Sequence, residues 1–291
     1  HRDLHSFPTR RSSDLPEIQW HQAQDILLKD IRADSRKVSQ GTLFVALGGT
    51  RTDGIEYLDE AISKGASAVI AREKRKIEKE LPFGVVEDPS RVLGKLDALF
   101  WGNPERSMVF SGVTGTNGKT TTTYLIRSIL QEAGHKTGLF GTIGYQCEER
   151  FVPATHTTPD PLSLNERLAE MKEQGASHIA MEVSSHSLLQ GRVAHLPFRC
   201  AVFTNLGRDH LDYHKTLEEY LDAKSVLFSM LSPDGHAILN HDDPASTQIA
   251  KKTRANLLFY GIRRKAQVFA RNMSLQSDHT RFVLVTPQGE C

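Results

Sequence analysis

The stretch GVTGTNGKT, residues 112–120, ends in the GK[ST] of the phosphate-loop pattern GxxxxGK[ST], with five residues rather than four between its first glycine and Gly118. The apolar run Ser107–Val113 leads into it, and a helical pattern begins at Lys119. In such a loop the glycines let backbone N–H groups converge on phosphate oxygens, and the start of the helix adds free donors and a favourable dipole. The stretch therefore predicts a strand–loop–helix unit that binds the phosphates of a nucleotide.

Two positions of this loop carry most of its chemistry. Lys119 supplies a point charge to the terminal phosphates, and the Thr120 hydroxyl is placed to bind Mg²⁺. A phosphate loop alone leaves kinases, GTPases, motors and ligases open, because a fold does not dictate a function. The residues expected to bind ATP are Gly115, Thr116, Asn117, Gly118, Lys119, Thr120 and Thr121.

Strands and helices alternate on both sides of the loop, which predicts an α/β fold. The central part is expected to form a P-loop-type, mostly parallel sheet with helices on both faces. Thr216 and Glu219 form a capping box that begins the last of these helices. The expected strands are 107–113, 137–140, 178–183, 201–204 and 236–239, the expected helices lie near 120–133, 162–174 and 216–231, and 267–269 and 280–285 are typical of a β-hairpin.

The residues before the loop predict a smaller α/β domain. A strand is expected at 42–47, a helix at 57–64 ending at Gly65, a strand at 68–71 and a helix at 92–101. Gly102, Asn103 and Pro104 predict a boundary, so that residues 16–103 form one domain and residues 104–291 the next. Residues 1–15 have adjacent arginines and no apolar stretch, which favours an artefactual or disordered tail over a signal peptide.

The composition excludes several classes of protein. A net charge of +1 gives no overall field for nucleic acid or an acidic membrane, so no nucleic-acid or membrane partner is expected. No apolar run approaches the ~20 residues of a membrane span. The three cysteines, Cys147, Cys200 and Cys291, are widely spaced and form no CxxC pair, which argues against a disulfide framework and a zinc site. A cytoplasmic enzyme is the expected class.

Two further segments place acidic and histidine residues directly after strands. Glu182 ends the apolar strand before Val183, at the sheet edge where α/β folds bind ligands, and its carboxylate is suited to hold Mg²⁺. Asp209, His210 and Asp212 follow the strand that ends at Thr204. Spacing alone leaves open whether His210 is a ligand or a structural histidine.

Together these segments resemble the Mur ligase family. They occur in family order over essentially all of residues 16–291. Their pattern favours the branch that extends UDP-N-acetylmuramoyl-L-alanyl-D-glutamate. The matching segments are 34–36 with 41–47, 113–123, 157–159, 181–186 with Gln190 and Arg192, 204–214, and 223–224.

The resemblance implies a reaction in which ATP activates a carboxylate as an acyl phosphate and an amine displaces the phosphate. In this branch the amine belongs to meso-diaminopimelate or lysine, and the protein is expected to be a monomer. The resemblance also assigns roles in catalysis. Lys119, Lys224 and His210 are catalytic, with Lys224 carrying a carbamate, and Thr120, Glu182 and His210 hold metal.

Substrate contacts follow from the same resemblance. Ser35 aligns with a uridine-site serine, beside the loop Thr50–Thr52. The loop Thr50–Thr52 departs from one form of the family pattern, and His156 stands where asparagine is common, so these contacts are less defined. The residues that align with contacts to the muramoyl peptide are Thr157, Thr158, Ser184, Gln190 and Arg192.

Alternatives remain at this point. The family has a third, Rossmann-like domain that selects the amino acid, and the chain is expected to stop before it, so an inactive fragment that binds ATP and a UDP-sugar is one alternative. Folylpolyglutamate synthetase is a second, although the segments 34–36 and 181–192 count against it. A kinase or GTPase is a third; no NKxD-type guanine motif follows the loop.

Overall fold

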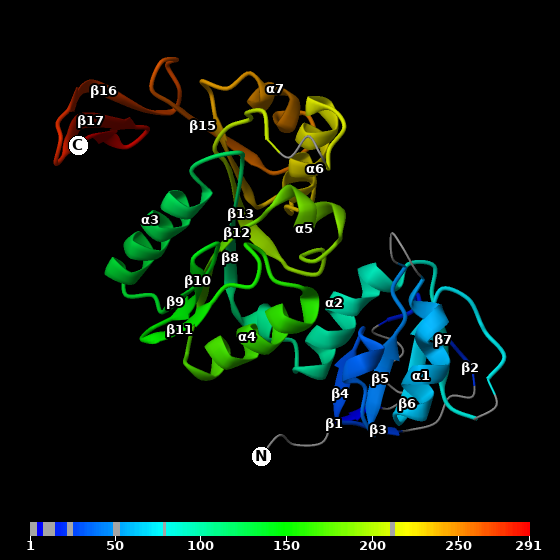
Figure 1. Cartoon of the computed structure of the whole chain (residues 1–291). Coiled ribbons are helices and arrows are strands. Elements are labelled where there is room, and N and C mark those ends of the chain that lie inside the picture. The colour runs from blue at the N-terminus through cyan, green and yellow to red at the C-terminus, as the bar shows by residue number, and fades with distance from the viewer. Residues whose placement is uncertain (1–4, 8–14, 22–25, 49–52, 78–79, 210–212) are drawn as a thin grey trace. The chain divides into compact units, whose positions relative to one another are not determined.

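The computed structural model describes the chain except for residues 1–4, 8–14, 22–25, 49–52, 78–79 and 210–212 (Figure 1). The chain folds into two compact units. The first contains residues 1–104, 161–169 and 191–195, and the second contains residues 105–160, 170–190 and 196–291. None of the helices in the described part is long and apolar enough to cross a bilayer.

The first unit is built on a sheet that, among the described residues, has five strands in the order β2-β7-β6-β5-β4. β4, β5, β6 and β7 are parallel, and β2 joins the edge antiparallel to β7. β1 (His5–Phe7) pairs separately with β3 (Ile26–Leu28). The elements of the sheet and its helices are β2 (Gln19–His21), β4 (Asp30–Arg32), β5 (Thr42–Val45), α1 (Leu58–Ser63), β6 (Ala66–Ala71), β7 (Phe83–Val85) and α2 (Pro89–Phe100).

Alternation along the strands of this sheet produces two cores. Leu43 and Val45 of β5 share one core with Val92 and Leu96 of α2. Phe44 belongs to the other core, which contains side chains of α1. Side chains of successive strand residues point to opposite faces, so the apolar run of β5 is buried on both. This explains why β5 has no polar face.

A buried polar contact joins the returning segments 161–169 and 191–195 to the first unit. Asn165 Nδ2 donates to the Gly94 carbonyl of α2 at 3.0 Å, and its Oδ1 accepts from His195 Nε2 at 2.9 Å. His195 Nδ1 is therefore the unprotonated nitrogen, and burial lowers the pKa of His195 to about 4. A Cβ at Gly94 would lie 2.3 Å from that nitrogen, so only glycine leaves room for the ring.

The second unit contains, over its described residues, an eleven-stranded sheet in the order β11-β10-β9-β12-β8-β13-β14-β15-β16-β17-β18. Neighbours from β9 to β16 are parallel, and the strands at both edges are antiparallel. Its strands are β8 (Val109–Thr114), β9 (Thr137–Phe140), β10 (Gly144–Cys147), β11 (Arg150–Pro153), β12 (His178–Glu182), β13 (Phe198–Phe203), β14 (His236–Asn240), β15 (Asn256–Gly261), β16 (Val268–Leu275), β17 (Thr280–Thr286) and β18 (Gly289–Glu290).

Helices cover both faces of this mostly parallel sheet, as the sequence predicted. Figure 1 shows α3 (Lys119–Glu132) on one side of β8 and β12, and α5 (Ser185–Leu189) and α6 (Leu217–Ser229) on the other. Thr216 caps α6 by accepting from the Glu219 N–H at 3.1 Å, as predicted, whereas the Glu219 carboxylate accepts from the Lys215 N–H at 2.9 Å and not from the Thr216 N–H of a full capping box. α4 (Pro161–Glu173) and α7 (Ala245–Ala250) complete the helices of the described chain.

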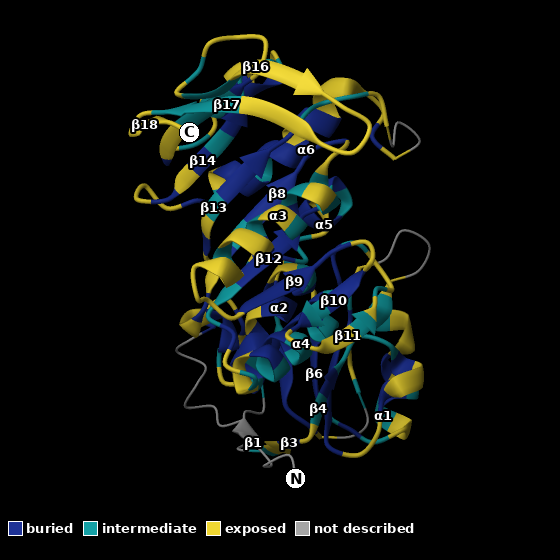
Figure 2. Cartoon of the chain, turned by 90° about the vertical axis from the view of Figure 1, so that its left-hand side faces the viewer, coloured by how far each residue is buried: buried dark blue, intermediate teal, exposed yellow. Residues whose placement is uncertain are grey.

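The last strands form an exposed hairpin. β16 and β17 pair antiparallel, as the sequence predicted, and Figure 2 shows much of both strands exposed. β10, β11 and β15 were not predicted. β10 and β11 form a short hairpin at the opposite edge of the sheet, and β15 extends the parallel part beyond β14.

Candidate active site

Three strand ends meet around the predicted phosphate loop. β8 lies between β12 and β13 and is parallel to both, so the residues that follow these strands lie at one edge of the sheet. The loop follows β8, Glu182 ends β12, and Thr204 follows β13. Functional side chains converge at this edge because parallel strands all end there.

The loop has the backbone geometry that its glycines permit. β8 ends at Thr114 and α3 begins at Lys119, so the loop occupies the intervening residues. Gly118 is the N-cap of α3 with a φ of 83°, and Gly115 has a φ of 151°. A Cβ at Gly115 would lie 1.9 Å from Thr204 Oγ1, so glycine is required by space as well as by conformation.

Two lysines share one acceptor in this loop. Lys119 Nζ donates to the Gly115 and Thr116 carbonyls, both at 2.9 Å, and Lys224 Nζ donates to the same Gly115 carbonyl at 2.9 Å. Lys224 is 1% exposed, and its Nζ lies 4.0 Å from the centroid of the Tyr220 ring. The structure thus brings together two of the predicted catalytic residues.

Burial perturbs both lysines. Burial lowers the pKa of Lys119, against the opposing influence of the Glu182 and Asp209 carboxylates. Burial, reinforced by the charge of Lys119, lowers the pKa of Lys224 from its usual 10.5 to about 7, although Asp209 opposes this. Lys224 is therefore available in part as the neutral amine near neutral pH.

The segment after β13 braces the loop in a way that the sequence did not predict. The Asn205 side chain accepts from the Asn117 N–H at 3.0 Å and donates to the Asn117 carbonyl at 3.1 Å. The Gly207 N–H also donates to Thr116 Oγ1 at 2.8 Å. Thr204 Oγ1 also donates to the Asn117 carbonyl at 2.6 Å. The loop is therefore held in shape before any ligand arrives.

Glu182 is a buried carboxylate beside this loop. It is 1% exposed, and its Oε1 and Oε2 accept from the backbone N–H and hydroxyl of Thr142 at 2.9 and 3.2 Å. These hydrogen-bond partners are neutral, and the charge of Lys119, with which Glu182 interacts, offsets part of the cost of burying the carboxylate. Hard cations such as Mg²⁺ prefer oxygen ligands. The Glu182 carboxylate therefore fits a magnesium ion, with the Thr120 hydroxyl as the second predicted donor.

The third predicted metal ligand, His210, lies outside the described residues, as does the loop Thr50–Thr52. Over the parts of the chain that the structure describes, no three His, Cys, Asp or Glu side chains cluster closely enough to hold a metal by themselves.

The residues predicted to contact the muramoyl peptide fall into two groups. Thr158 is buried, donates to the Glu182 carbonyl at 2.9 Å and accepts from the Ser184 N–H at 3.1 Å. Thr157 Oγ1 lies 3.1 Å from Thr142 Oγ1. These side chains form one polar patch with Glu182. The other two lie further along the chain: Gln190 is the exposed C-cap of α5, and Arg192 belongs to the first unit.

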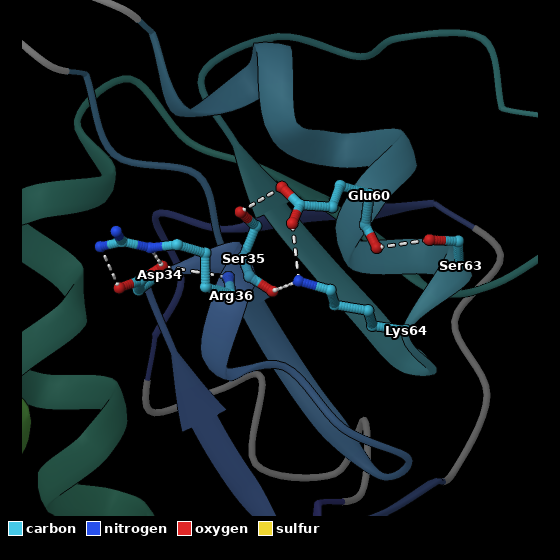
Figure 3. Close-up of polar contacts among 6 residues, drawn as sticks. All are labelled: Asp34, Ser35, Arg36, Glu60, Ser63 and Lys64. Atoms are coloured by element: carbon cyan, nitrogen blue, oxygen red, sulfur yellow. Dashed lines mark hydrogen bonds and ion pairs between the residues drawn. The ribbon is translucent and has the colours of Figure 1, made fainter.

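Ser35 lies in a separate polar cluster of the first unit (Figure 3). Its hydroxyl donates to Glu60 Oε2 at 2.7 Å, and Lys64 Nζ donates to Glu60 Oε1 at 2.6 Å. Hydrogen bonds from Lys64 and Ser35 lower the pKa of Glu60, which keeps it an acceptor. Next to it, Asp34 caps the short 3-10 helix that contains Ser35 and pairs with Arg36.

The fold and the loop define a phosphate-loop α/β protein, and the comparisons with known proteins specify the family. A family model described as "Mur ligase middle domain" matches residues 113–291, and a second, described as "Mur ligase family, catalytic domain", matches residues 28–106. The chain belongs to the Mur ligase family.

Individual relatives agree with this assignment. The UDP-N-acetylmuramoyl-L-alanyl-D-glutamate–2,6-diaminopimelate ligase of Bacillus licheniformis is 41% identical over 272 residues, which are 91% of this chain and 55% of the relative. A solved structure of a ligase with the same name matches with a TM-score of 0.78 and 29% identity, over 91% of this chain and 55% of that one. The chain thus spans about half the length of the curated relatives that it matches.

The folylpolyglutamate synthetase alternative has only distant support. E. coli FolC, solved in complex with DHPP and ADP, matches 68% of the chain with a TM-score of 0.54 and 19% identity. That similarity shows a shared fold alone.

Proposed function

We propose that this chain provides the ATP-binding and UDP-sugar-binding parts of a cytoplasmic, monomeric ligase. The ligase adds 2,6-diaminopimelate to UDP-N-acetylmuramoyl-L-alanyl-D-glutamate. The meeting of Lys119, Lys224 and Glu182 at one sheet edge carries this proposal. The names of the relatives supply the substrate. Residues 16–103 form the proposed UDP-sugar-binding domain and residues 104–291 the proposed ATP-binding domain.

The proposed reaction has two steps. A carboxylate oxygen of the glutamyl residue attacks the γ-phosphorus of ATP, and ADP leaves. The amine nitrogen of the diamino acid then attacks the carbonyl carbon of the acyl phosphate, inorganic phosphate leaves, and the nitrogen loses a proton. Both partners of the first step are anions, so the site must supply positive charge where they meet.

Lys119 supplies part of that charge. Its ammonium donates to the Gly115 and Thr116 carbonyls, which keeps the charge at the loop that is proposed to bind the phosphates. The backbone donors at the start of α3 complete the phosphate site, because the first N–H groups of a helix have no partner within the helix. The ATP-binding residues are proposed to be those from Gly115 to Thr121.

Glu182, Thr120 and His210 would hold magnesium. When bound, the metal offsets the negative charge of the phosphates and of the carboxylate. Glu182 is fixed for this task by Thr142, and Gly141 is close enough that a Cβ there would lie 2.3 Å from Glu182 Oε1.

Lys224 is the proposed site of a carbamate. Formation of a carbamate requires a neutral amine, and the lowered pKa of Lys224 makes that form available near pH 7. The N–C bond forms between Lys224 Nζ and the carbon of CO₂, and the amine loses a proton. The product carries a negative charge in place of a positive one.

Ser35 is the proposed contact to the uracil base. Because the Glu60 carboxylate can only accept, the Ser35 hydroxyl must donate to it. The serine oxygen is then left with lone pairs, which suit the N3–H donor of uracil. Cytosine has an acceptor at that position, so this orientation favours a uridine nucleotide. Thr157, Thr158, Ser184, Gln190 and Arg192 are proposed to contact the muramoyl peptide.

Calorimetric titration with Mg·ATP tests the nucleotide site. The wild-type chain is expected to bind, and Lys119→Ala is expected to lose most of the affinity while keeping the circular dichroism spectrum of the fold. Lys136→Ala is the matched control, because Lys136 is an exposed lysine that donates to the Gln174 carbonyl. Unchanged ATP binding by a folded Lys119→Ala chain contradicts the proposed site.

Activity is tested in a chimera. The C-terminal part of the B. licheniformis relative, which has no counterpart in this chain, is joined after Cys291. The chimera is expected to release phosphate and form the tripeptide with 2,6-diaminopimelate. Formation of tripeptide with lysine in preference, or phosphate release that does not depend on the UDP-sugar, overturns the proposed substrates.

A further inference from the structure

Tyr220 is a fully buried residue of α6 that the proposed reaction does not use. It is 1% exposed and lies one helical turn before Lys224, so that both side chains share a face of α6. Two contacts of this side chain stand out. The ring face lies 4.0 Å from Lys224 Nζ, and the His214 ring lies at 4.9 Å.

The ring face matters because Lys224 has few other sources of stabilisation. Its ammonium donates to the Gly115 carbonyl, but Lys119 donates to the same oxygen and repels it. The face of an aromatic ring carries negative charge density and stabilises a cation above it, more strongly where water is excluded. Tyr220 therefore stabilises the charged form of a lysine whose burial disfavours that form.

The ring also packs against a buried histidine. His214 is 2% exposed, and its Nε2 lies 2.9 Å from Ser185 Oγ of α5. Because His214 packs against Tyr220, the ring cannot move toward it without displacing a buried, hydrogen-bonded histidine. This contact restricts the movement of the ring.

We propose that Tyr220 is a positioning residue. The face of its ring holds the unmodified ammonium of Lys224 at the Gly115 carbonyl.

Two substitutions separate the contribution of the ring from that of the hydroxyl. Tyr220→Phe keeps the ring and removes the hydroxyl, and Tyr220→Leu removes both. Tyr145 provides the matched control, since it is also buried, and its hydroxyl donates to the His156 carbonyl at 2.8 Å. Tyr145→Phe and Tyr145→Leu therefore make the same chemical changes away from Lys224.

The measurement is the pKa of Lys224. A pH titration is monitored by NMR of lysines labelled with ¹³C at Cε, and the signal of Lys224 is assigned with Lys224→Ala. Tyr220→Leu is expected to lower the pKa of Lys224 further, by about one unit, because a cation over a ring is stabilised by an energy of that order. Tyr220→Phe and both Tyr145 variants are expected to leave it unchanged. Lys119 and Asp209, the charged groups that act on Lys224, are the same in all variants.

Two results overturn the proposal. An unchanged pKa of Lys224 in Tyr220→Leu excludes the role of the ring, and an equal fall of that pKa in Tyr220→Phe shows that the ring face is not its cause. If Tyr220→Leu does not fold, a ring-fluorinated phenylalanine at position 220 keeps the shape but removes the negative face, and it must lower the pKa of Lys224 relative to phenylalanine.

Discussion

Gly115→Ala is expected to damage the phosphate loop through the backbone as well as through space. Gly115 has a φ of 151°, a backbone angle that residues other than glycine rarely adopt. A Cβ there would lie 1.9 Å from Thr204 Oγ1 and 3.1 Å from the Asn205 backbone. Thr204 cannot move freely, because its hydroxyl donates to the Asn117 carbonyl.

Two contributions give the magnitude. The unfavourable backbone conformation costs about 1–3 kcal/mol, and displacement of packed atoms costs roughly another 1–3 kcal/mol. Gly134→Ala is the matched control, because Gly134 also has a positive φ, of 85°, but has nothing within 4 Å of the added carbon. It isolates the backbone contribution, about 1–2 kcal/mol.

The difference between the two variants is therefore expected to be about 2 kcal/mol, which lowers Tm by a further ~4–8 °C in a unit of this size. Thermal unfolding and urea titration measure it, and calorimetry should show that only Gly115→Ala loses Mg·ATP affinity. The double variant with Thr204→Ala should recover part of the stability, since the closest atom is gone. Equal stability and equal ATP affinity of the two alanine variants would refute this account of the loop.

Other predictions concern buried and paired groups. Because the pKa of Lys224 is lowered from 10.5 to about 7, the unfolded chain binds more protons than the folded chain between these two pH values. The free energy of unfolding should therefore rise with pH from about 7 to 10.5. Urea titrations at several pH values measure this rise, and Lys224→Met should reduce it. Gly94→Ala gains ~1 kcal/mol of helix propensity but displaces His195 at a cost of ~1–3 kcal/mol, so a net loss of up to ~2 kcal/mol is expected in thermal unfolding. A stabilised variant contradicts this packing. Glu60→Gln should reduce the ratio of the affinities for UDP and CDP, measured by competition binding. An unchanged ratio would show that Glu60 does not contribute to base recognition.

The fold could be predicted largely because its signals are local. Alternation of apolar strands with amphipathic helices follows from the periods of the two structures, and the helix cap at Thr216 was read from two residues. β15 was not predicted although Leu257–Tyr260 is an apolar run; within the strand only its last residue is buried. The hairpin β10–β11 is short and half exposed, so its pattern was weak.

Contacts between distant segments could not be predicted in the same way. Asn205 and Asn117 are 88 positions apart, and neither residue type implies the other. The same holds for Asn165 and His195, which join two later segments to the first unit. Hydrogen bonds of this kind depend on how strands are ordered in the sheet, and strand order leaves no pattern along a single sequence.

The candidate site shows most clearly where a motif stops being informative. The pattern GxxxxGK[ST] names Lys119 and Thr120 but leaves position 115 unspecified. In the folded chain it is the Gly115 carbonyl that accepts from both Lys119 and Lys224, and the missing side chain at 115 makes room for Thr204. A carbonyl is present at every residue, so its role cannot be read from residue identity. What the sequence does record is the glycine, because at this position any side chain would meet the segment that braces the loop.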